Sequence, residues 1–389
     1  MSRSALARMF RFLALVALAA TLIAGTSAAA PAKAFIPEKP PARTQVQKTP
    51  DERGGVNPCN TKEPPPGVYG SWDRATSIGQ MIMPVRGGVT KDGKFDLVIH
   101  FHGHDPVRRE FVKVMDGAVL VGITLGIGSG VYEQTFANPA AFTDLIASTE
   151  KEVAKLRGLK KAKVRRLALS AWSAGYGAVE SILRQKSARD MVDAVILLDG
   201  LHTGYNPDGT LERSGLEPFI EFAKRAKAGK RFMYVSHSSI IPPGYASTTE
   251  TVNYLIHELG GKPKSAKPRK GDPMGLDLNS KFDSGNFHAR GFDGNDKMDH
   301  CAHIGLIREV MKAHLKKRWK TPKGFGPKKD GSDKGAPAVK KDADADKPSK
   351  KDADESDPKK QDAKKVDAKA DKPKGGKSGS PKKKKKTKS

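Results

Sequence analysis

Cysteine and aromatic residues are scarce in this 389-residue sequence, which has two Cys and 6% aromatic residues. Two cysteines cannot support a small disulfide-stapled scaffold. Residues 321–389 contain no Trp or Tyr and a single Phe, but 23 Lys and 12 acidic residues. Such a segment cannot bury enough apolar surface to offset the entropy that it loses on ordering. We therefore expect 321–389 to be a disordered basic tail, rich in Lys, Asp, Ala and Pro.

Acidic residues are also few, with 43 Asp and Glu against 70 Lys and Arg, a net charge of +27. The tail closes with six Lys between Lys382 and Lys388. This charge favours contact with an anionic surface, although a tail that only keeps the protein in solution would have the same composition. Because the tail has neither interleaved aromatic residues nor a known module, we predict no specific nucleic-acid binding.

The apolar run near the N-terminus is short. It covers 12–25, or 14 residues, whereas a membrane-spanning helix needs about 20. Three arginines precede this run and small residues follow it, which is the pattern of a secretory signal peptide over 1–30. We therefore expect an exported protein, periplasmic or extracellular, with no transmembrane segment in the mature chain.

The middle of the chain has the pattern of one α/β domain. Residues 31–69 are rich in Pro and polar residues and are expected to form an extended lead-in or linker. Across 70–320, apolar runs alternate with helical patterns, which predicts a mostly parallel sheet with helices on both faces. The expected strands are 95–101, 118–123, 164–171, 192–198, 231–235 and 286–292, and the expected helices are 139–156, 174–185, 219–226, 248–259 and 300–319.

The sharpest motif is LALSAWSAGYG at 167–177, in which an apolar strand runs through Ser173 into a helix. A serine on a tight strand-to-helix turn has strained backbone angles. The residues two before and two after it, here Ala171 and Gly175, must be small so that strand and helix can approach each other. The turn lifts the hydroxyl clear of the sheet, beside the helix N-terminus. Ser173 is therefore the predicted nucleophile.

This segment resembles the nucleophile elbow of the α/β-hydrolase superfamily, except that Ala171 stands where Gly is commoner. The resemblance implies an α/β-hydrolase-like fold and serine esterase or lipase chemistry without a cofactor. His102 and Gly103 end an early strand, as in the His-Gly oxyanion loops of esterases. By the same resemblance, the backbone N–H groups of His104 and Ala174 would form the oxyanion hole.

In this superfamily the acid and the histidine follow the serine in chain order. Asp199 directly follows the strand after the elbow helix, and the next strand has no acid at its tip. His300 comes between the last strand and the last helix, and its position ahead of that helix favours it over His303 as the base. Further candidates for the pocket or an alternative base are His102, Gly103, Trp172, His202, His237 and His303.

The segment HFHGHD at 100–105 offers a rival site. His100, His102 and His104 would share one face of a strand, and Asp105 follows them, as in the ligand clusters of metallohydrolases. A metal centre there would leave the motif around Ser173 unexplained, whereas an oxyanion loop accounts for His102 without metal. We therefore predict no metal ligands and keep the metal-dependent hydrolase as an alternative.

The two cysteines, Cys59 and Cys301, have no CxxC spacing. In an exported protein a free thiol is a liability, so we expect a disulfide between them. A buried free thiol at Cys301 is the alternative.

The sequence as a whole predicts an exported serine esterase that acts through Ser173, His300 and Asp199 on a small-molecule or polymer-borne ester. Besides the metal-dependent hydrolase, the other alternative is a non-catalytic hydrolase-fold binding protein anchored by its basic tail.

Overall fold

The structure, a computed structural model, describes most of the chain between Phe35 and Pro327. The predicted signal peptide and nearly all of the predicted tail lie outside the described residues. None of the helices in the described part is both long and apolar enough to cross a bilayer. The described ranges are 35–41, 47–60, 67–72 and 74–327.

A mixed ten-stranded sheet organises the described residues. Its six central strands are parallel, and antiparallel strands flank them at both edges. The α/β class is confirmed, but the prediction of a mostly parallel sheet is wrong. Edge strands are short or alternate polar and apolar residues, so a search for apolar runs misses them. The order is β1 (Arg74–Ala75), β2 (Gln80–Ile82), β5 (Val119–Ile123), β4 (Lys94–Phe101), β6 (Lys163–Trp172), β7 (Val192–Leu198), β8 (Phe232–Ser238), β11 (Phe287–Asp293), β10 (Asp277–Ser284) and β9 (Lys264–Ser265).

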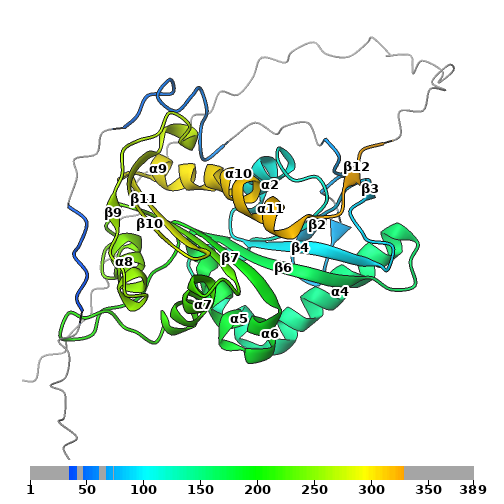
Figure 1. The fold of residues 1–389 in the computed structure, drawn as a ribbon, viewed down its shortest axis with the longest axis horizontal. Coiled ribbons are helices and arrows are strands. Elements are labelled where there is room, and N and C mark those ends of the chain that lie inside the picture. Colours follow the sequence, from blue (N-terminus) through cyan, green and yellow to red (C-terminus); the bar gives the residue numbers. More distant parts are fainter. Residues whose placement is uncertain (1–34, 42–46, 61–66, 73, 328–389) are drawn as a thin grey trace, which may run out of the picture. The chain divides into compact units, whose positions relative to one another are not determined.

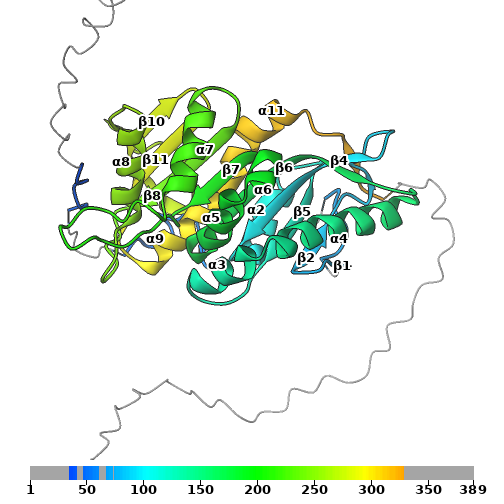
Figure 2. The same ribbon diagram turned by 90° about the horizontal axis from the view of Figure 1, so that it is seen from below.

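Helices cover both faces of this sheet (Figures 1 and 2). Alternate residues of a strand point to opposite faces, so Leu167 and Leu169 of β6 pack in one apolar core and Ala168 packs in the other. The first core contains helices α3 (Gly130–Ala137), α4 (Pro139–Arg157), α5 (Tyr176–Arg184), α6 (Lys186–Met191), α7 (Glu217–Lys227) and α8 (Thr248–Glu258). The second contains α2 (His104–Val112), α9 (Lys297–Ala302), α10 (Leu306–Val310) and α11 (Lys316–Trp319).

The last helix begins earlier than expected and is not uniform. Instead of one helix over 300–319, α9 starts at Lys297, and a 3₁₀ turn and a π-helical turn separate α9, α10 and α11. Gly305 in the 3₁₀ turn packs against Pro273, where a Cβ would be only 3.0 Å from the proline side chain.

Described residues on both sides of 70–320 also contact the predicted domain. Part of the lead-in packs against the domain, and Arg53 is only 3% exposed. At the other end, β12 (Gly324–Phe325) pairs with β3 (Arg86–Gly87), although composition had placed these residues in the tail. Composition misses both contacts because they depend on a few close-packed residues in polar surroundings. These residues on both sides of 70–320 thus fall in the same compact unit as the predicted domain.

Candidate active site

Ser173 lies on a tight turn between a strand and a helix. β6 ends at Trp172, a 3₁₀ turn (η1, Ser173–Gly175) follows, and α5 begins at Tyr176. The φ of Ser173 is 50°, in the left-handed region that non-glycine residues rarely enter. Its hydroxyl therefore stands where a strand ends and where the first N–H groups of a helix have no intrahelical partner.

Two glycines let neighbouring segments come close to this turn. A Cβ at Gly175 would overlap the carbonyl oxygen of Phe101 at the end of β4, and a Cβ at Gly200 would overlap the backbone of Ser173. Ala171, two residues before the serine, is buried. Gly175 is thus required by the close approach of β4, and Gly200 by the close approach of the chain after β7 to Ser173.

Asp199 directly follows β7, and its carboxylate accepts three hydrogen bonds. The donors are the backbone N–H of Ser238 (2.9 Å), the hydroxyl of Thr248 (2.7 Å) and Nδ1 of His300 (2.7 Å). Burial raises the pKa of Asp199, but the imidazoles of His303 and His300 lower it by more, to below its usual range. The carboxylate is therefore ionised at neutral pH.

His300 points Nδ1 at Asp199. Since a carboxylate only accepts, Nδ1 carries a proton, and Nε2 is the nitrogen that can take up another. His300 lies within α9 and not, as predicted, in the loop ahead of the last helix. Asp296 caps this helix by accepting from the backbone N–H of Asp299 (2.7 Å).

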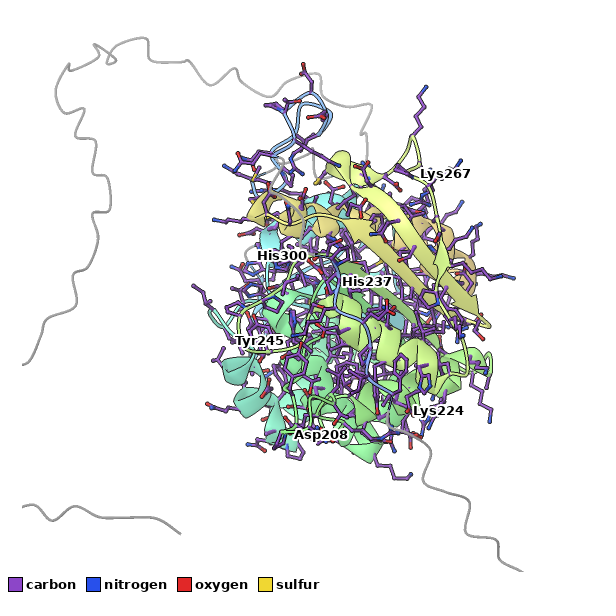
Figure 3. The ribbon with its side chains drawn as sticks, turned by 90° about the vertical axis from the view of Figure 1, so that its left-hand side faces the viewer. Asp208, Lys224, His237, Tyr245, Lys267 and His300 are labelled. Carbon is purple, nitrogen blue, oxygen red and sulfur yellow. A yellow bond between two sulfur atoms is a disulfide. The ribbon has the colours of Figure 1, made fainter. Side chains whose placement is uncertain are left out.

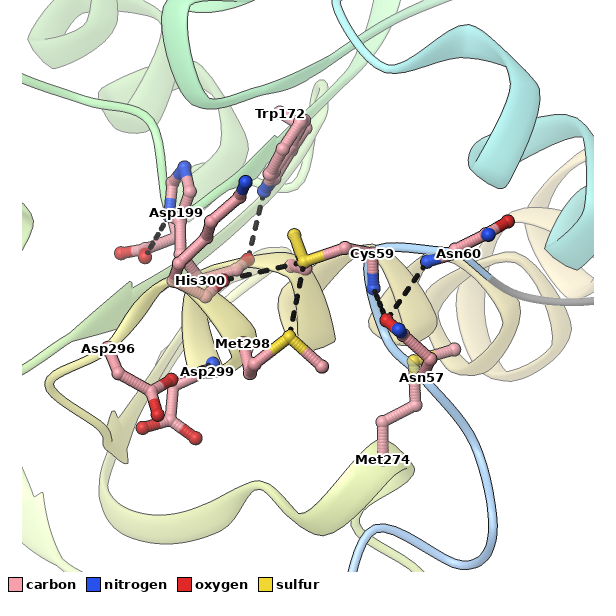
Figure 4. Close-up of a disulfide and its surroundings, with 12 residues drawn as sticks. Asn57, Cys59, Asn60, Trp172, Asp199, Met274, Asp296, Met298, Asp299 and His300 are labelled. Carbon is pink, nitrogen blue, oxygen red and sulfur yellow. Dashed lines mark hydrogen bonds and ion pairs between the residues drawn. A yellow bond between two sulfur atoms is a disulfide. The ribbon is translucent and has the colours of Figure 1, made fainter. Parts of the chain in front are cut away.

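Trp172 connects the turn at Ser173 to α9. Its indole N–H donates to the carbonyl of His300 (3.0 Å), as Figure 4 shows. The centroid of its ring lies 4.8 Å from the centroid of the His300 imidazole and 5.2 Å from that of the His102 imidazole. The residue before the candidate nucleophile therefore helps to position the candidate base.

Ser173, Asp199 and His300 line one cavity of about 350 Å³. Tyr245 and His300, which both line it, lie on the same side of the molecule in Figure 3. Within the described residues, the Ser173 hydroxyl makes no hydrogen bond to His300, and such contacts often tighten only when substrate binds. Loops supply other lining residues, among them His202 after β7, Ile240, Pro242 and Tyr245 after β8, and Asn295 and Lys297 at the start of α9.

The two predicted oxyanion donors both lie at helix starts. His104 is the first residue of α2, and Ala174 lies in η1. His102 and Gly103 both have a φ of 68°, and a Cβ at Gly103 would come within 2.7 Å of the Trp172 ring. The loop before His104 therefore packs against the turn that carries Ala174.

The three histidines of the rival metal site use their ring nitrogens separately. Burial lowers the pKa of His100 to about 3, so its ring is neutral, and it donates to the carbonyl of His102 (2.7 Å) and accepts from a serine hydroxyl (2.9 Å). Nδ1 of His102 bonds the Tyr132 hydroxyl, and Nδ1 of His104 bonds the Thr124 hydroxyl. Among the described residues, no group of three His, Cys, Asp or Glu could hold a metal ion.

Of the other candidate pocket residues, His202 lines the cavity, and His102, Gly103 and Trp172 lie beside it. His237 and His303 are buried and do not line it. Their Nδ1 atoms bond the hydroxyls of Thr249 and Ser236, respectively, both at 2.8 Å.

Sequence reasoning missed the partners of Asp199 and most of the cavity wall. Thr248 is the first residue of α8. The capping box that Ser247 and Glu250 form there predicts the start of a helix but no role in a site. Ile240 and Pro242, which form part of the wall, belong to the segment after β8 that contains Pro242 and Pro243, and its sequence indicates only a loop.

A disulfide and an ion pair join residues 47–60 to α9 (Figure 4). Cys59 forms a disulfide with Cys301, with Cα atoms 5.1 Å apart. The buried guanidinium of Arg53 lies 2.9 Å from the carboxylate of Asp299. The two residues of α9 that are held in this way are the immediate neighbours of the candidate base.

No family model and no curated protein matches the chain. Among solved structures, it is similar to an uncharacterised protein from Capnocytophaga ochracea (10% identity, TM-score 0.35, covering 60% of this chain and 59% of that chain). It is also similar to an acylaminoacyl peptidase from Pyrococcus horikoshii (12%, TM-score 0.35, 63% and 40%) and to an esterase from Pyrococcus furiosus (14%, TM-score 0.31, 73% and 99%). The chain thus spans less than two thirds of the first two proteins. Likenesses this distant do not establish a family.

Proposed function

We propose that the chain is an exported serine hydrolase that cleaves carboxylic esters. The observation that supports this most is the 2.7 Å hydrogen bond between His300 and Asp199 at the cavity that Ser173 also lines. Nucleophilic acyl transfer needs such a set: a hydroxyl, an imidazole beside it and a carboxylate that orients the imidazole. Export rests on the sequence of 1–30 alone.

In the first half of the reaction, Nε2 of His300 takes the proton of Ser173 while Oγ attacks the carbonyl carbon. Asp199 stays ionised and stabilises the imidazolium through the Nδ1 hydrogen bond. The backbone N–H groups of Ala174 and His104 bind the oxyanion. His300 then gives its proton to the leaving alcohol as the ester C–O bond breaks.

In the second half, water attacks the acyl-enzyme. His300 takes a proton from this water, and the new oxyanion is held by the same two N–H groups. When the bond to Ser173 breaks, the proton returns to Oγ and the carboxylic acid leaves.

The test is turnover of a short-chain p-nitrophenyl ester by Ser173→Ala. We expect a loss of about 10³-fold or more in kcat, with an unchanged circular dichroism spectrum, because the change removes only one oxygen. Ser181→Ala is the matched control, since Ser181 lies on α5 with its hydroxyl bonded to the carbonyl of Glu133, and it should retain wild-type turnover. A folded Ser173→Ala protein with wild-type turnover would overturn the proposal.

A further inference from the structure

His202 lines the cavity but has no part in the mechanism above. It lies three residues after Asp199, on the chain whose Gly200 packs against the backbone of Ser173. Asp199 and His300 both influence its pKa, so its ring lies within electrostatic reach of the reacting groups. Whatever His202 binds therefore lies close to the reaction centre.

The hydrogen bond of Nδ1 determines the tautomer of His202. Nδ1 lies 2.9 Å from the carbonyl oxygen of Ala246, and a carbonyl can only accept, so Nδ1 carries the proton. Burial lowers the pKa of His202 and outweighs the opposing effect of this hydrogen bond. The ring is therefore neutral at pH 7, and Nε2 has a lone pair but no proton.

The ring is also held in orientation. Tyr176 and Tyr245 lie roughly perpendicular to it, with ring centroids at 5.8 and 5.0 Å. The backbone of Ala246 is fixed in turn, since its N–H donates to the carbonyl of Thr203 (2.9 Å). No described residue is hydrogen-bonded to Nε2. The cavity thus contains a preorganised acceptor.

We propose that His202 is a substrate-binding residue that selects esters carrying a hydrogen-bond donor, such as a hydroxyl group, near the scissile bond. The inference rests on the serine hydrolase function proposed above and names the substrate class of that site. A substrate without the donor leaves Nε2 unpaired when the cavity is filled, and an unpaired polar atom costs more than the hydrogen bond alone is worth. The hydroxyl can belong to the acyl group or to the alcohol.

The experiment compares kcat/KM within two matched ester pairs. The acyl pair is p-nitrophenyl 3-hydroxybutyrate and p-nitrophenyl butyrate, and the alcohol pair is 2,3-dihydroxypropyl butyrate and propyl butyrate. We expect the wild-type enzyme to prefer the hydroxylated member of one pair by about tenfold. The pair that shows the preference identifies which side of the ester reaches His202.

The variant His202→Phe should abolish this preference. Phenylalanine keeps an aromatic ring at this position but has no hydrogen-bond acceptor. The variant His202→Gln, whose amide oxygen can reach the position of Nε2, should restore part of the preference. His257→Phe is the matched control, because it makes the same replacement at an exposed residue of α8 that does not line the cavity, and it should keep the wild-type ratio.

The readout is a ratio, so a purely structural role for His202 would lower both rates and leave the ratio unchanged. An unchanged ratio in His202→Phe, or no preference in either wild-type pair, would overturn the inference while the ester hydrolase function stands. Full turnover by Ser173→Ala would overturn both.

Discussion

Backbone strain at single residues gathers around the cavity. Among the described residues, five that are not glycine have a left-handed backbone, and three of them are His102 (φ 68°), Ser173 (φ 50°) and Asp199 (φ 46°). Each such conformation costs on the order of 1–3 kcal/mol and persists only where its surroundings hold it. The strain thus falls on the candidate oxyanion loop, nucleophile and acid, and supports treating them as one site.

At the residue scale, the two histidines of α9 and the turn after it should differ sharply. We expect His300→Ala to lower kcat/KM by about 10³-fold, nearly as much as the loss of Ser173, because Nε2 of His300 is the proton acceptor. His303→Asn should cost less than about tenfold, because asparagine can still bond Ser236 and His303 does not line the cavity. Steady-state kinetics on one ester decides, and the reverse ranking would reassign the base to His303.

Buried histidines should make the fold sensitive to acid. Burial lowers the pKa of His100 to about 3 and the pKa values of the buried His237 and His303 and the half-buried His314 to about 4, against about 6.5 in an unfolded chain. Between these values the unfolded chain binds more protons, so stability is complete above about pH 6.5 and is lost as pH falls toward 3–4. Urea unfolding should give a lower midpoint at about pH 5 than at about pH 7.5. Equal midpoints would contradict these assignments.

That Ser173, Asp199 and His300 line one cavity could be predicted from the sequence, because each of them follows a strand. The tautomer of His202 could not be predicted from the sequence, because it depends on a hydrogen bond to Ala246, 44 residues further along the chain. The spacing of residues in the sequence does not predict such a hydrogen bond.

At the scale of elements, the short helix α9 depends on contacts from far upstream. It has six residues and is marginal by itself. The disulfide of Cys59 and the ion pair of Arg53 hold it on either side of His300. The 47–60 segment is therefore part of the scaffold of the candidate site.

Cys59→Ser should lower both stability and turnover. The disulfide joins residues 242 apart, and the chain-entropy model assigns such a link about 5 kcal/mol. We expect a lower melting temperature, and a reduced kcat because the restraint beside His300 is gone. Asn60→Ser is the control, since it alters the adjacent exposed residue and should change neither. Two reactive thiols in denatured, unreduced wild-type protein would exclude the bridge.

Buried strands could be predicted well, since β4, β5 and β7 are mostly apolar and their observed bounds differ by at most one residue from the expected ones. For the 47–60 segment, the sequence predicted the disulfide of Cys59 but not the ion pair of Arg53, because nothing in the sequence identifies Asp299 as the partner of Arg53.

At the scale of the whole molecule, we expect the basic segment 328–389 to act in adsorption to anionic surfaces and not in turnover. A chain that ends at Pro327 should keep wild-type turnover on a soluble ester, because we expect from composition that 328–389 makes no contribution to the apolar core. It should lose adsorption to anionic vesicles, an attraction that salt weakens because the screening length is about 8 Å at 0.15 M.

A chain that ends at Pro322 is the matched comparison. It also lacks β12, where Gly324 packs closely on Pro84 and Phe325 pairs with Arg86, and we expect a lower melting temperature than for the chain that ends at Pro327. Loss of turnover in the chain that ends at Pro327 would contradict the prediction that 328–389 is not needed for catalysis.

The central claim, that Ser173 is an activated nucleophile, is tested most directly by labelling the intact protein with a fluorophosphonate and mapping the modified peptide by mass spectrometry. The account predicts one adduct per chain, on Ser173, and a strongly reduced labelling rate in His300→Ala. An unlabelled chain that still hydrolyses esters, or an adduct on another serine, would contradict it.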